Sequence, residues 1–341
     1  MTPRERFIAA CRREPVDRPP AWMMRQAGRY LPEYRATRET KGGFLAMVHD
    51  PATAAEITLQ PIRRFGMDAA VIFCDILVPP AAMGAGVRFE EGVGPLLDPP
   101  VRDADGVRAL GGFDPAEATG FLAQALRLVR AELGDERALI GFCGAPFTVA
   151  SYLIEGRSSR NFEHTKAMML GEPALFHELM SQVVDVSIPY LAMQVEAGAD
   201  ALQIFDSWGG ALDERTYRKY ILPHVTRLVS GARESGVPVI VYLNGCGHLL
   251  EALADSGADV LSIDWRVPPE QAIERVGDRV GLQGNLDPCT LFAPPEVVEE
   301  EARRVLDAFA PQQGYVFNLG SGILPKTPLE SVEALWRTVL A

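Results

Sequence analysis

Two arginines four residues apart form the first candidate binding element of this chain. Arg25 and Arg29 flank the turn residues Gln26, Ala27 and Gly28, directly after a short apolar stretch. A guanidinium presents a planar fork of N–H donors that matches a carboxylate, so two such forks on one flexible turn could hold an acidic small molecule. By spacing alone, two solvated surface arginines in a glycine-containing turn are the more common arrangement.

Polar side chains also follow several predicted strands at the point where each strand ends. These residues are Asp75, Asp206, Ser207, Asn244, Asp264, Asn285 and Asn318. Each of them alone is typical of a helix cap or a turn. In a parallel barrel, however, the carboxyl ends of the strands meet at one mouth, so the joint placement of these residues indicates an enzyme.

The elements that must position these residues are apolar runs of strand length, which alternate with amphipathic stretches of helix length. The predicted strands are Ala21–Met24, Ala69–Ile76, Ala138–Phe142, Ala201–Phe205, Pro238–Leu243, Val260–Asp264, Val280–Gly284 and Tyr315–Leu319. The predicted helices are Ala52–Phe65, Ala116–Leu133, Pro173–Ala197, Glu214–Glu234, Pro269–Val276, Glu296–Phe309 and Leu329–Leu340. Eight strands with intervening helices predict a closed (β/α)8 barrel of the TIM type, with an open doubly wound sheet as the alternative.

The chain shows no break in composition that would divide it. Residues 1–341 are therefore predicted to form a single barrel domain with decorated loops. The segment Val78–Asp103 is rich in Gly and Pro and predicts an excursion with a small hairpin. No glycine-rich phosphate-binding motif follows the first strand, so the sequence offers no obvious cradle for a nucleotide.

Composition and charge exclude several classes of protein. The apolar stretches are short and interrupted, which argues against a membrane-spanning helix, and 48% hydrophobic residues argue against disorder. A net charge of −12 argues against binding to nucleic acid or anionic membranes. The first forty residues are an exception, with nine Arg against five acidic residues. Five scattered cysteines without a Cys-x-x-Cys pair favour reduced thiols and a cytoplasmic location.

Several runs of the sequence carry a resemblance to a known family. The run Trp22-Met-Met-Arg-Gln-Ala-Gly-Arg-Tyr-Leu-Pro-Glu-Tyr-Arg35 is similar to the N-terminal signature of the uroporphyrinogen decarboxylase family, and the run 141–156 resembles its second signature. Further likeness lies at 73–77, 205–208, 282–288 and 317–320, in the order of the family. On these motifs the chain is identified as a member.

The resemblance implies a (β/α)8-barrel homodimer that acts on uroporphyrinogen without a cofactor or a metal. The reaction would remove carbon dioxide from the four acetate arms of uroporphyrinogen III and give coproporphyrinogen III. The implied catalytic residues are Asp75, which would stabilise a protonated pyrrole ring, and Arg25 and Arg29, which would hold carboxylates. The implied substrate-binding residues are Arg25, Gln26, Ala27, Gly28, Arg29, Asp75, Tyr152, Phe205, Ser207 and Ser321.

One position departs from the pattern of the family. The family usually has Asn-Leu-Gly-His-Gly near the C-terminus, whereas this chain has Asn318-Leu-Gly-Ser-Gly322. Ser321 can donate one hydrogen bond but carries no positive charge at any pH. A mechanism that depends on a histidine at this position is therefore in doubt for this chain.

Two other functions are compatible with parts of the sequence. Cys246, His248 and Cys289 could in principle bind zinc, as in a related family of methyltransferases that act on corrinoid proteins and thiols. That family has the order His-x-Cys, whereas this chain has Cys-x-His and contains the Arg-Gln-Ala-Gly-Arg turn. A barrel that binds a tetrapyrrole without catalysis is the other alternative.

Overall fold

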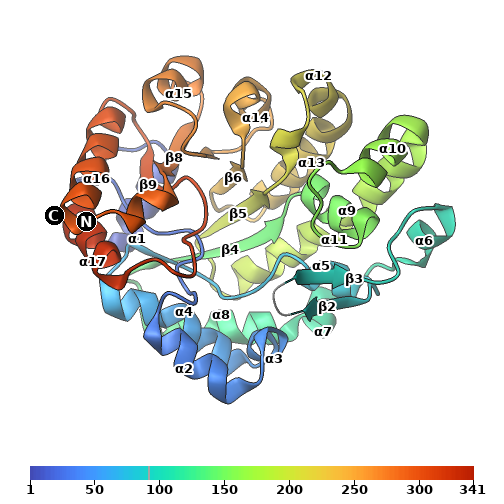
Figure 1. Ribbon diagram of the computed structural model, residues 1–341, viewed down its shortest axis with the longest axis horizontal. Coiled ribbons are helices and arrows are strands. Elements are labelled where there is room, and N and C mark those ends of the chain that lie inside the picture. The colour runs from blue at the N-terminus through green and yellow to red at the C-terminus, as the bar shows by residue number, and fades with distance from the viewer. Residues whose placement is uncertain (91–92) are drawn as a thin grey trace.

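The central feature of the fold is a sheet of parallel strands that curls on itself inside a layer of helices (Figure 1). The computed structural model describes residues 1–90 and 93–341, and within them the sheet has seven strands. In their order of pairing, these are β1 (Ala69–Val71), β4 (Ala138–Gly144), β5 (Ala201–Asp206), β6 (Val239–Leu243), β7 (Val260–Ile263), β8 (Gly281–Leu286) and β9 (Tyr315–Leu319). Nearly every strand residue is buried, because the sheet is covered on both faces.

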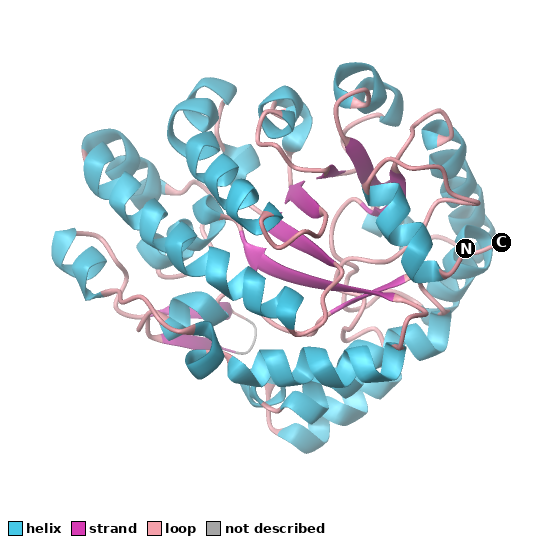
Figure 2. Ribbon diagram, turned by 180° about the vertical axis from the view of Figure 1, so that it is seen from behind, coloured by secondary structure: helices cyan, strands magenta, loops and turns pink. Residues whose placement is uncertain are grey.

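Helices connect successive strands and form the outer layer (Figure 2). The α-helices in the first half of the chain are α1 (Pro3–Cys11), α2 (Pro32–Lys41), α3 (Phe44–His49), α4 (Pro51–Phe65), α5 (Val78–Ala82), α6 (Ala104–Ala109), α7 (Pro115–Ala118), α8 (Gly120–Leu133), α9 (Pro146–Glu155) and α10 (Glu163–Gly171). The second half contains α11 (Pro173–Glu196), α12 (Glu214–Thr216), α13 (Leu222–Arg233), α14 (Leu250–Ala254), α15 (Pro269–Val276), α16 (Pro295–Phe309) and α17 (Leu329–Val339). None of the helices in the described residues has the length and apolar character needed to cross a membrane.

Short turns of other helix types complete the connections. The 3₁₀ turns are η1 (Gly209–Ala211), η3 (Cys246–His248) and η4 (Pro288–Phe292), and η2 (Tyr217–Ile221) is a π-helix. The predicted hairpin is confirmed as the antiparallel pair β2 (Val87–Glu90) and β3 (Gly94–Leu97). Residues 91 and 92 of the predicted excursion lie outside the described residues.

The first predicted strand, Ala21–Met24, is wrong in extent, because only Ala21 pairs with the sheet, in a single bridge to Phe317 of β9. The amides of the next residues bind side chains instead of a strand. Met23 donates to the Gln26 Oε1 atom at 3.5 Å, and Met24 donates to the Asn318 Oδ1 atom at 2.9 Å. The sheet accordingly has seven strands in the described residues, against the eight that the sequence predicts.

The short segment around Ala21 nevertheless lies between the two edge strands of the sheet. On one side, Trp22 donates to the Phe317 carbonyl and Phe317 donates to the Pro20 carbonyl, at 3.3 and 2.8 Å. On the other side, Asp68, which precedes β1, donates to the Ala21 carbonyl at 2.9 Å. Backbone hydrogen bonds therefore link this segment to both edges.

Two other elements differ from the prediction for identifiable reasons. Strand β1 ends at Val71, because the Phe73 amide donates to the Thr58 hydroxyl at 2.9 Å and not to the sheet. The predicted helix Glu214–Glu234 is divided into α12, η2 and α13. Pro223 stands at the start of α13 and has no N–H to donate, so the preceding turn widens to the π form.

Candidate active site

The turn that carries Arg25 is fastened to the end of strand β9. Met24 donates its amide to the Asn318 side chain at 2.9 Å, and Ile323 donates its amide to the Met24 carbonyl at 3.0 Å. The turn therefore has bonds to residues on both sides of Ser321. This arrangement brings two segments together that are nearly 300 residues apart in the sequence.

Arg25 itself has a left-handed backbone, with φ of +61°. Such a conformation costs a residue with a Cβ atom about 1–2 kcal/mol, so the surrounding contacts must hold it in place. Its side chain passes over Gly322, where a Cβ atom would come within 2.4 Å of the Arg25 Cδ atom. Glycine at position 322 is thus needed for the course of the arginine side chain.

The other residues of the turn differ in exposure. The Gln26 side chain is completely buried, and its backbone carbonyl accepts a hydrogen bond from the Tyr30 hydroxyl at 2.7 Å. Ala27 and Gly28 are half-buried, and a Cβ atom at Gly28 would lie 3.2 Å from the Arg25 carbonyl oxygen. A side chain at position 28 would therefore press against the backbone of the turn itself.

Arg29 is exposed and lies beside Tyr34, because its charge is one of those that lower the pKa of that tyrosine against the raising effect of burial. Within the described residues, neither Arg25 nor Arg29 forms an ion pair. By contrast, Arg4, Arg6 and Arg18 are all paired with Asp side chains. Both arginines of the turn are thus free to bind an external carboxylate.

Asp75 lies just beyond strand β1 and is half-buried. Its Oδ1 atom accepts a hydrogen bond from the Leu77 amide at 2.8 Å. Burial raises the pKa of Asp75 to about 6, although the Leu77 amide and the positive charge of Arg25 act in the opposite direction. The carboxylate is therefore held close to Arg25 in surroundings that penalise its charge.

Tyr152 on helix α9 joins the same group of side chains. The pKa of Tyr152 is raised to about 12, mainly by burial and also by the charge of Asp75, whereas the charge of Arg25 acts in the opposite direction. The hydroxyl is accordingly a neutral donor near both residues. The Tyr152 ring packs against Trp208, with ring centres 4.2 Å apart.

Aromatic rings form one wall of this region. Phe205 on β5 is half-buried and meets Phe142 and Tyr242 edge to face, with ring centres 5.4 and 6.1 Å away. Ser207 and Trp208 follow directly and are also half-buried. Trp208 and Tyr242 are absent from the sequence-based site. Trp208 belongs to the motif at 205–208, which was the available signal, whereas Tyr242 lies inside an apolar run.

Ser321 is half-buried in the loop after β9, and the Tyr242 hydroxyl donates to the carbonyl of the preceding residue, Gly320, at 3.3 Å. Arg25 also lies near Tyr242, because its charge acts to lower the pKa of that hydroxyl. The structure thus brings Arg25, Asp75, Tyr152 and Ser321 into one region. Phe205 borders this region, where its ring packs against that of Tyr242. The structure gives no contact between Arg29 and this group within the described residues.

Most of the polar residues at the strand ends support loops. Asp264 accepts hydrogen bonds from the amides of Gly245, Cys246 and Arg266 at 2.6 to 2.9 Å. Asp206 accepts from the Thr148 hydroxyl and from the amides of Trp208 and Gly209 at 2.7 to 3.2 Å.

The three asparagines at strand ends also make structural contacts. Asn285 donates to two carbonyls, Asn244 accepts from the Arg266 side chain, and Asn318 holds the Met24 amide. Asp206 and Asp264 each accept local hydrogen bonds of the cap or turn type, whereas the other contacts of these residues join separate segments of the chain.

The residues considered for zinc do not form a site. The His248 Nε2 atom lies 2.7 Å from the Leu212 carbonyl oxygen, the Cys246 thiol is buried, and Cys289 is exposed. Across residues 1–90 and 93–341, no three His, Cys, Asp or Glu side chains come together as metal ligands.

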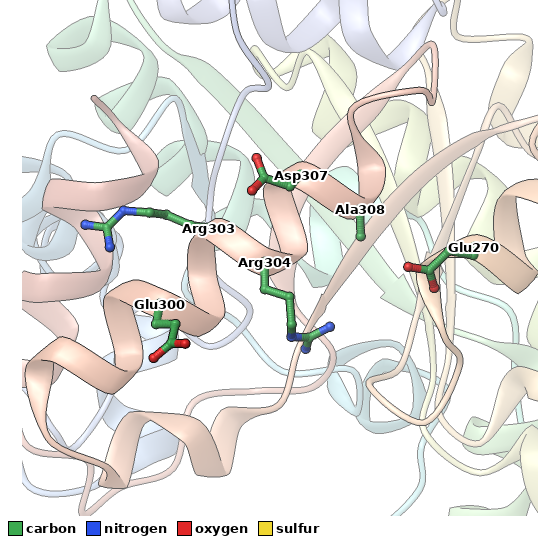
Figure 3. Close-up of a pocket in the computed structure, with 6 residues that line it drawn as sticks. All are labelled: Glu270, Glu300, Arg303, Arg304, Asp307 and Ala308. Atoms are coloured by element: carbon green, nitrogen blue, oxygen red, sulfur yellow. The ribbon is translucent and has the colours of Figure 1, made fainter.

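A surface hollow of about 580 Å³ lies on the outer helices and shares no residue with the group around Asp75. Figure 3 shows its lining residues on α15 and α16, which are Glu270, Glu300, Arg303, Arg304, Asp307 and Ala308. Because charges of both signs alternate there, the hollow has no clear preference for an anion or a cation.

Among solved structures, the chain is similar in fold to a methyltransferase from Methanosarcina mazei, with a TM-score of 0.82 and 23% identity over 99% of this chain and 98% of that one. It is also similar to a B12-independent methionine synthase from Shewanella, with a TM-score of 0.56 and 11% identity over 85% and 87% of the two chains. At these identities the likeness concerns the fold alone.

Curated relatives are considerably more similar in sequence. The uroporphyrinogen decarboxylase of Alkalilimnicola ehrlichii is 49% identical, over 97% of this chain and 92% of that protein. The enzyme of the same name from Methylococcus capsulatus is 46% identical, over 98% and 96% of the two chains. The family model described as uroporphyrinogen decarboxylase matches residues 2–341. With Arg25, Asp75 and Tyr152 gathered at one site and this match over nearly its full length, the chain belongs to the uroporphyrinogen decarboxylase family.

Proposed function

We propose that this protein removes carbon dioxide from the acetate side chains of uroporphyrinogen III and produces coproporphyrinogen III in tetrapyrrole biosynthesis. The observation that carries the proposal is the half-buried Asp75 carboxylate, which accepts one hydrogen bond, from the Leu77 amide, and on which the positive charge of the unpaired Arg25 acts. Membership of the family supports the substrate, and the geometry supports the roles of the individual residues.

The chemistry requires an electron sink. When the bond between the acetate carbon and its carboxyl group breaks, the electron pair stays on the carbon, and a neutral pyrrole cannot accept it. Protonation of the ring at the adjacent carbon creates a cation that can accept the pair. After carbon dioxide has left, a second proton on the exocyclic carbon completes the methyl group, and loss of the first proton from the ring carbon restores the neutral pyrrole. Because the substrate ring itself serves as the sink, the proposed reaction needs no cofactor.

Asp75 would stabilise this cationic ring. Its carboxylate can accept hydrogen bonds from pyrrole N–H groups, and it is already oriented by the Leu77 amide before the charge develops. With a pKa of about 6, most of this carboxyl is ionised at pH 7. A fixed anion in surroundings of low polarity acts more strongly on the transition state than the same anion in water.

The two arginines of the turn would bind substrate carboxylates through charge-assisted hydrogen bonds. Arg25 is also our candidate for organising the proton that is delivered, although a guanidinium is too weak an acid to supply it, and a water or the substrate would be the donor. Gln26, Ala27 and Gly28 would shape the turn that presents these arginines.

The remaining residues would hold the macrocycle and its side arms. The Tyr152 hydroxyl is a neutral donor for a reacting acetate, and Ser207 and Ser321 would bind propionate arms. Phe205 would pack against the tetrapyrrole with its exposed edge. All four side chains are half-buried, so each has both a fixed position and an accessible surface.

The substitution Asp75→Asn tests the proposal. It preserves the shape of the side chain and an acceptor for the Leu77 amide but removes the negative charge, so we expect turnover to fall about 10²- to 10³-fold. The measurement is an anaerobic assay with uroporphyrinogen that follows products with seven to four carboxylates. Near-parent turnover of a folded Asp75→Asn protein would contradict the role of the charge, and a wild-type chain that binds the macrocycle without releasing carbon dioxide would contradict the reaction.

Three finer features of the molecule belong to the same proposal. We infer that the segment around Ala21 takes the place of the eighth strand and closes a (β/α)8 barrel, which the hydrogen bonds of Ala21, Trp22 and Asp68 support. We further propose a single domain over residues 1–341 and a homodimer. Sedimentation equilibrium at micromolar concentrations measures the dimer directly, and a monomer mass would contradict it.

A further inference from the structure

Arg266 lies just beyond the carboxyl end of strand β7, in the loop that begins at Asp264. Its side chain is 54% exposed, and its guanidinium carbon lies over the Trp265 ring, 4.0 Å from the ring centre. Stacking on an aromatic face fixes the plane of a guanidinium and leaves the N–H groups in that plane able to donate. The arginine is thus held in one orientation although more than half of its side chain is exposed.

The hydrogen bonds of the Arg266 side chain use one of its three nitrogens within the described residues. The Nη1 atom donates to the Asn244 Oδ1 atom at 3.2 Å and to the Asp264 Oδ1 atom at 3.1 Å. The Nε and Nη2 atoms form the other edge of the guanidinium, and no hydrogen bond to the described residues involves them. Because their two N–H groups are parallel, this edge matches the two oxygens of a carboxylate.

The ion pair with Asp264 leaves positive charge on Arg266. Its length of 3.1 Å exceeds the roughly 2.7–2.9 Å that is usual for a charge-assisted hydrogen bond. Asp264 also accepts hydrogen bonds from the amides of Gly245, Cys246 and Arg266 at 2.6 to 2.9 Å, and these amides offset part of its negative charge. Asp264 and Asn244 therefore set the direction of the guanidinium without neutralising it.

Two backbone contacts place Arg266 at the mouth of the sheet. A Cβ atom at Gly320 would overlap the Trp265 amide nitrogen, so the loop after β7 touches the loop after β9. A Cβ atom at Gly210 would overlap the Asn244 carbonyl oxygen, so the loop after β6 touches the loop after β5. Arg266 accordingly stands on the rim of the mouth, where the carboxyl ends of the strands meet.

The proposed substrate is large enough to reach this rim. It carries carboxylate arms on all four of its pyrrole rings, so its negative charge extends around the whole macrocycle. When one ring lies at Asp75, the arms of the other rings point to other parts of the mouth. A cation on the loops after β6 and β7 can therefore bind an arm while a different arm reacts.

We propose that Arg266 binds a carboxylate arm of the substrate through its Nε and Nη2 atoms, on a ring other than the one that is reacting. Asn244, Asp264 and the Trp265 ring hold the guanidinium in position for this contact. The inference rests on the proposed function for the identity of the ligand. It adds to the site an arginine that the sequence motifs did not include.

The test is Arg266→Gln, with steady-state kinetics on uroporphyrinogen. Asp264 keeps its three backbone donors in this variant, so the loop should retain its shape. We expect KM to rise about three- to tenfold, as for one partly exposed charge-assisted contact, with kcat within about twofold because the contact is the same before and during the reaction. Arg266→Lys keeps the charge but loses the fork, so it should raise KM by a smaller factor.

Arg279→Gln is the matched control. Arg279 is also exposed and also pairs with one aspartate, Asp255, at 2.6 Å, but it precedes β8 and so lies at the opposite end of the strands. This change should leave KM unaltered. If Arg266→Gln leaves KM unaltered as well, or if both changes raise KM equally, the inference is wrong.

A second arm uses ionic strength, which separates a contact between charges from a purely structural role. Salt screens the attraction between exposed charges, so the KM of the wild type should rise between about 0.05 and 0.5 M sodium chloride. The rise should be smaller for Arg266→Gln, which has one cation fewer in contact with the substrate. A purely structural role would lower the thermal stability of Arg266→Gln and leave the rise equal to that of the wild type, which would overturn the inference.

Absence of product with the wild type would contradict the proposed function instead. The Kd of uroporphyrinogen, measured for the wild type and for Arg266→Gln, then decides the inference by itself. A weaker Kd in the variant would support the arginine contact. Equal values, or no binding to either protein, would overturn it.

Discussion

At the scale of single residues, Asp75 differs from the other aspartates at the strand ends in how few donors it has. Asp264 is fully buried and accepts hydrogen bonds from three backbone amides, which occupy both of its oxygens. Asp75 accepts from the Leu77 amide alone within the described residues. Its second oxygen is available for a ligand, so the same residue type serves a loop in one place and the proposed reaction in another.

The charge of Asp75 has few hydrogen bonds to stabilise it, so it lowers the free energy of unfolding, and Asp75→Asn should reveal this cost. Burial raises the pKa of Asp75 to about 6 from an ordinary 3.8, so the folded protein binds more protons than the unfolded chain between these values. Stability therefore falls as pH rises through this window, and the full cost is present at pH 7. Because the side chain is only half-buried, we expect Asp75→Asn to gain about 1–2 kcal/mol at pH 7.

The measurement for Asp75→Asn is urea unfolding at pH 7.5 and at pH 4.5, where the gain should be smaller. Asp287→Asn is the matched control, because Asp287 makes the same bond to the amide two residues ahead, that of Cys289, at 2.8 Å. We expect no gain from this control. A destabilised Asp75→Asn protein at pH 7.5 would contradict the cost of the charge.

At the scale of elements, strands β4 to β9 and most of the predicted helices follow the prediction closely. Strand β9 and helix α15 have the predicted bounds, and β4 to β8 differ by at most two residues at either end. These elements are long apolar or amphipathic runs, for which the pattern of the sequence is decisive. Two errors lie where a side chain accepts a hydrogen bond from a backbone amide, as Thr58 does from Phe73 and Asn318 does from Met24, and a third lies at Pro223. Hydrogen bonds of this kind join residues that are distant in the sequence, so they leave no local pattern.

In the candidate site too, residues within a local sequence pattern were predicted, and residues defined by distant contacts were not. The Arg-Gln-Ala-Gly-Arg turn and Asp75 were predicted from motifs, and the strand-end rule predicted a shared mouth. Tyr242 was missed because a tyrosine inside an apolar run is typical of a core residue. Its hydroxyl donates to the Gly320 carbonyl, nearly 80 residues later in the chain, and such a contact leaves no local pattern.

A histidine pair joins helices α11 and α13 outside the site. The His177 Nδ1 and His224 Nε2 atoms are 2.8 Å apart, and the His177 ring also stacks on Tyr220. The pKa of His224 is lowered to about 4, mainly by burial and also by the charges of His177 and Arg227. The junction between these two helices therefore depends on a neutral His224.

This junction predicts a loss of stability in mild acid. The folded protein binds fewer protons than the unfolded chain between pH 6.5 and about 4, so stability falls as pH falls through that window, by about 2–3 kcal/mol for His224. His224→Asn can still bond with His177 but does not titrate, so its unfolding free energy should depend less on pH. His164→Asn, at an exposed position of α10, serves as the control. Equal slopes for wild type and His224→Asn in urea unfolding would contradict this prediction.

At the scale of the whole molecule, Asp68 connects the N-terminal segment to the sheet. It is fully buried, its carboxylate accepts from Arg6 and Arg18 at 2.8 to 3.0 Å, and it also binds the Ala21 amide at 2.8 Å. The excess of arginines in the first forty residues is thus used in two ways. Arg6 and Arg18 are paired with buried acid, whereas Arg25 and Arg29 are left for a ligand.

Asp68→Asn should weaken both the fold and the site. It leaves two guanidinium groups without a buried counter-charge, which we expect to cost about 3–5 kcal/mol in urea unfolding. It also loosens the segment that leads to Arg25, so KM for uroporphyrinogen should rise. Asp200→Asn is the control, because Asp200 pairs with Arg4 and Arg130 at a distance from this segment and should lower stability without raising KM. A rise in KM of the same size in both variants would contradict the specific link.

The bonds from Met24 to Asn318 and Ile323 have a consequence for the synthesis of the protein. A ribosome releases the arginine turn early, but the residues that hold it in place emerge about 290 residues later. The strands in between can pair with their neighbours as they appear, whereas the turn has no fixed shape until the last strand is added. Nascent chains that stop before residue 318 should therefore hold a partly formed sheet with no capacity to bind the substrate, so the ability to bind arises in one step, once residues 318–323 have emerged.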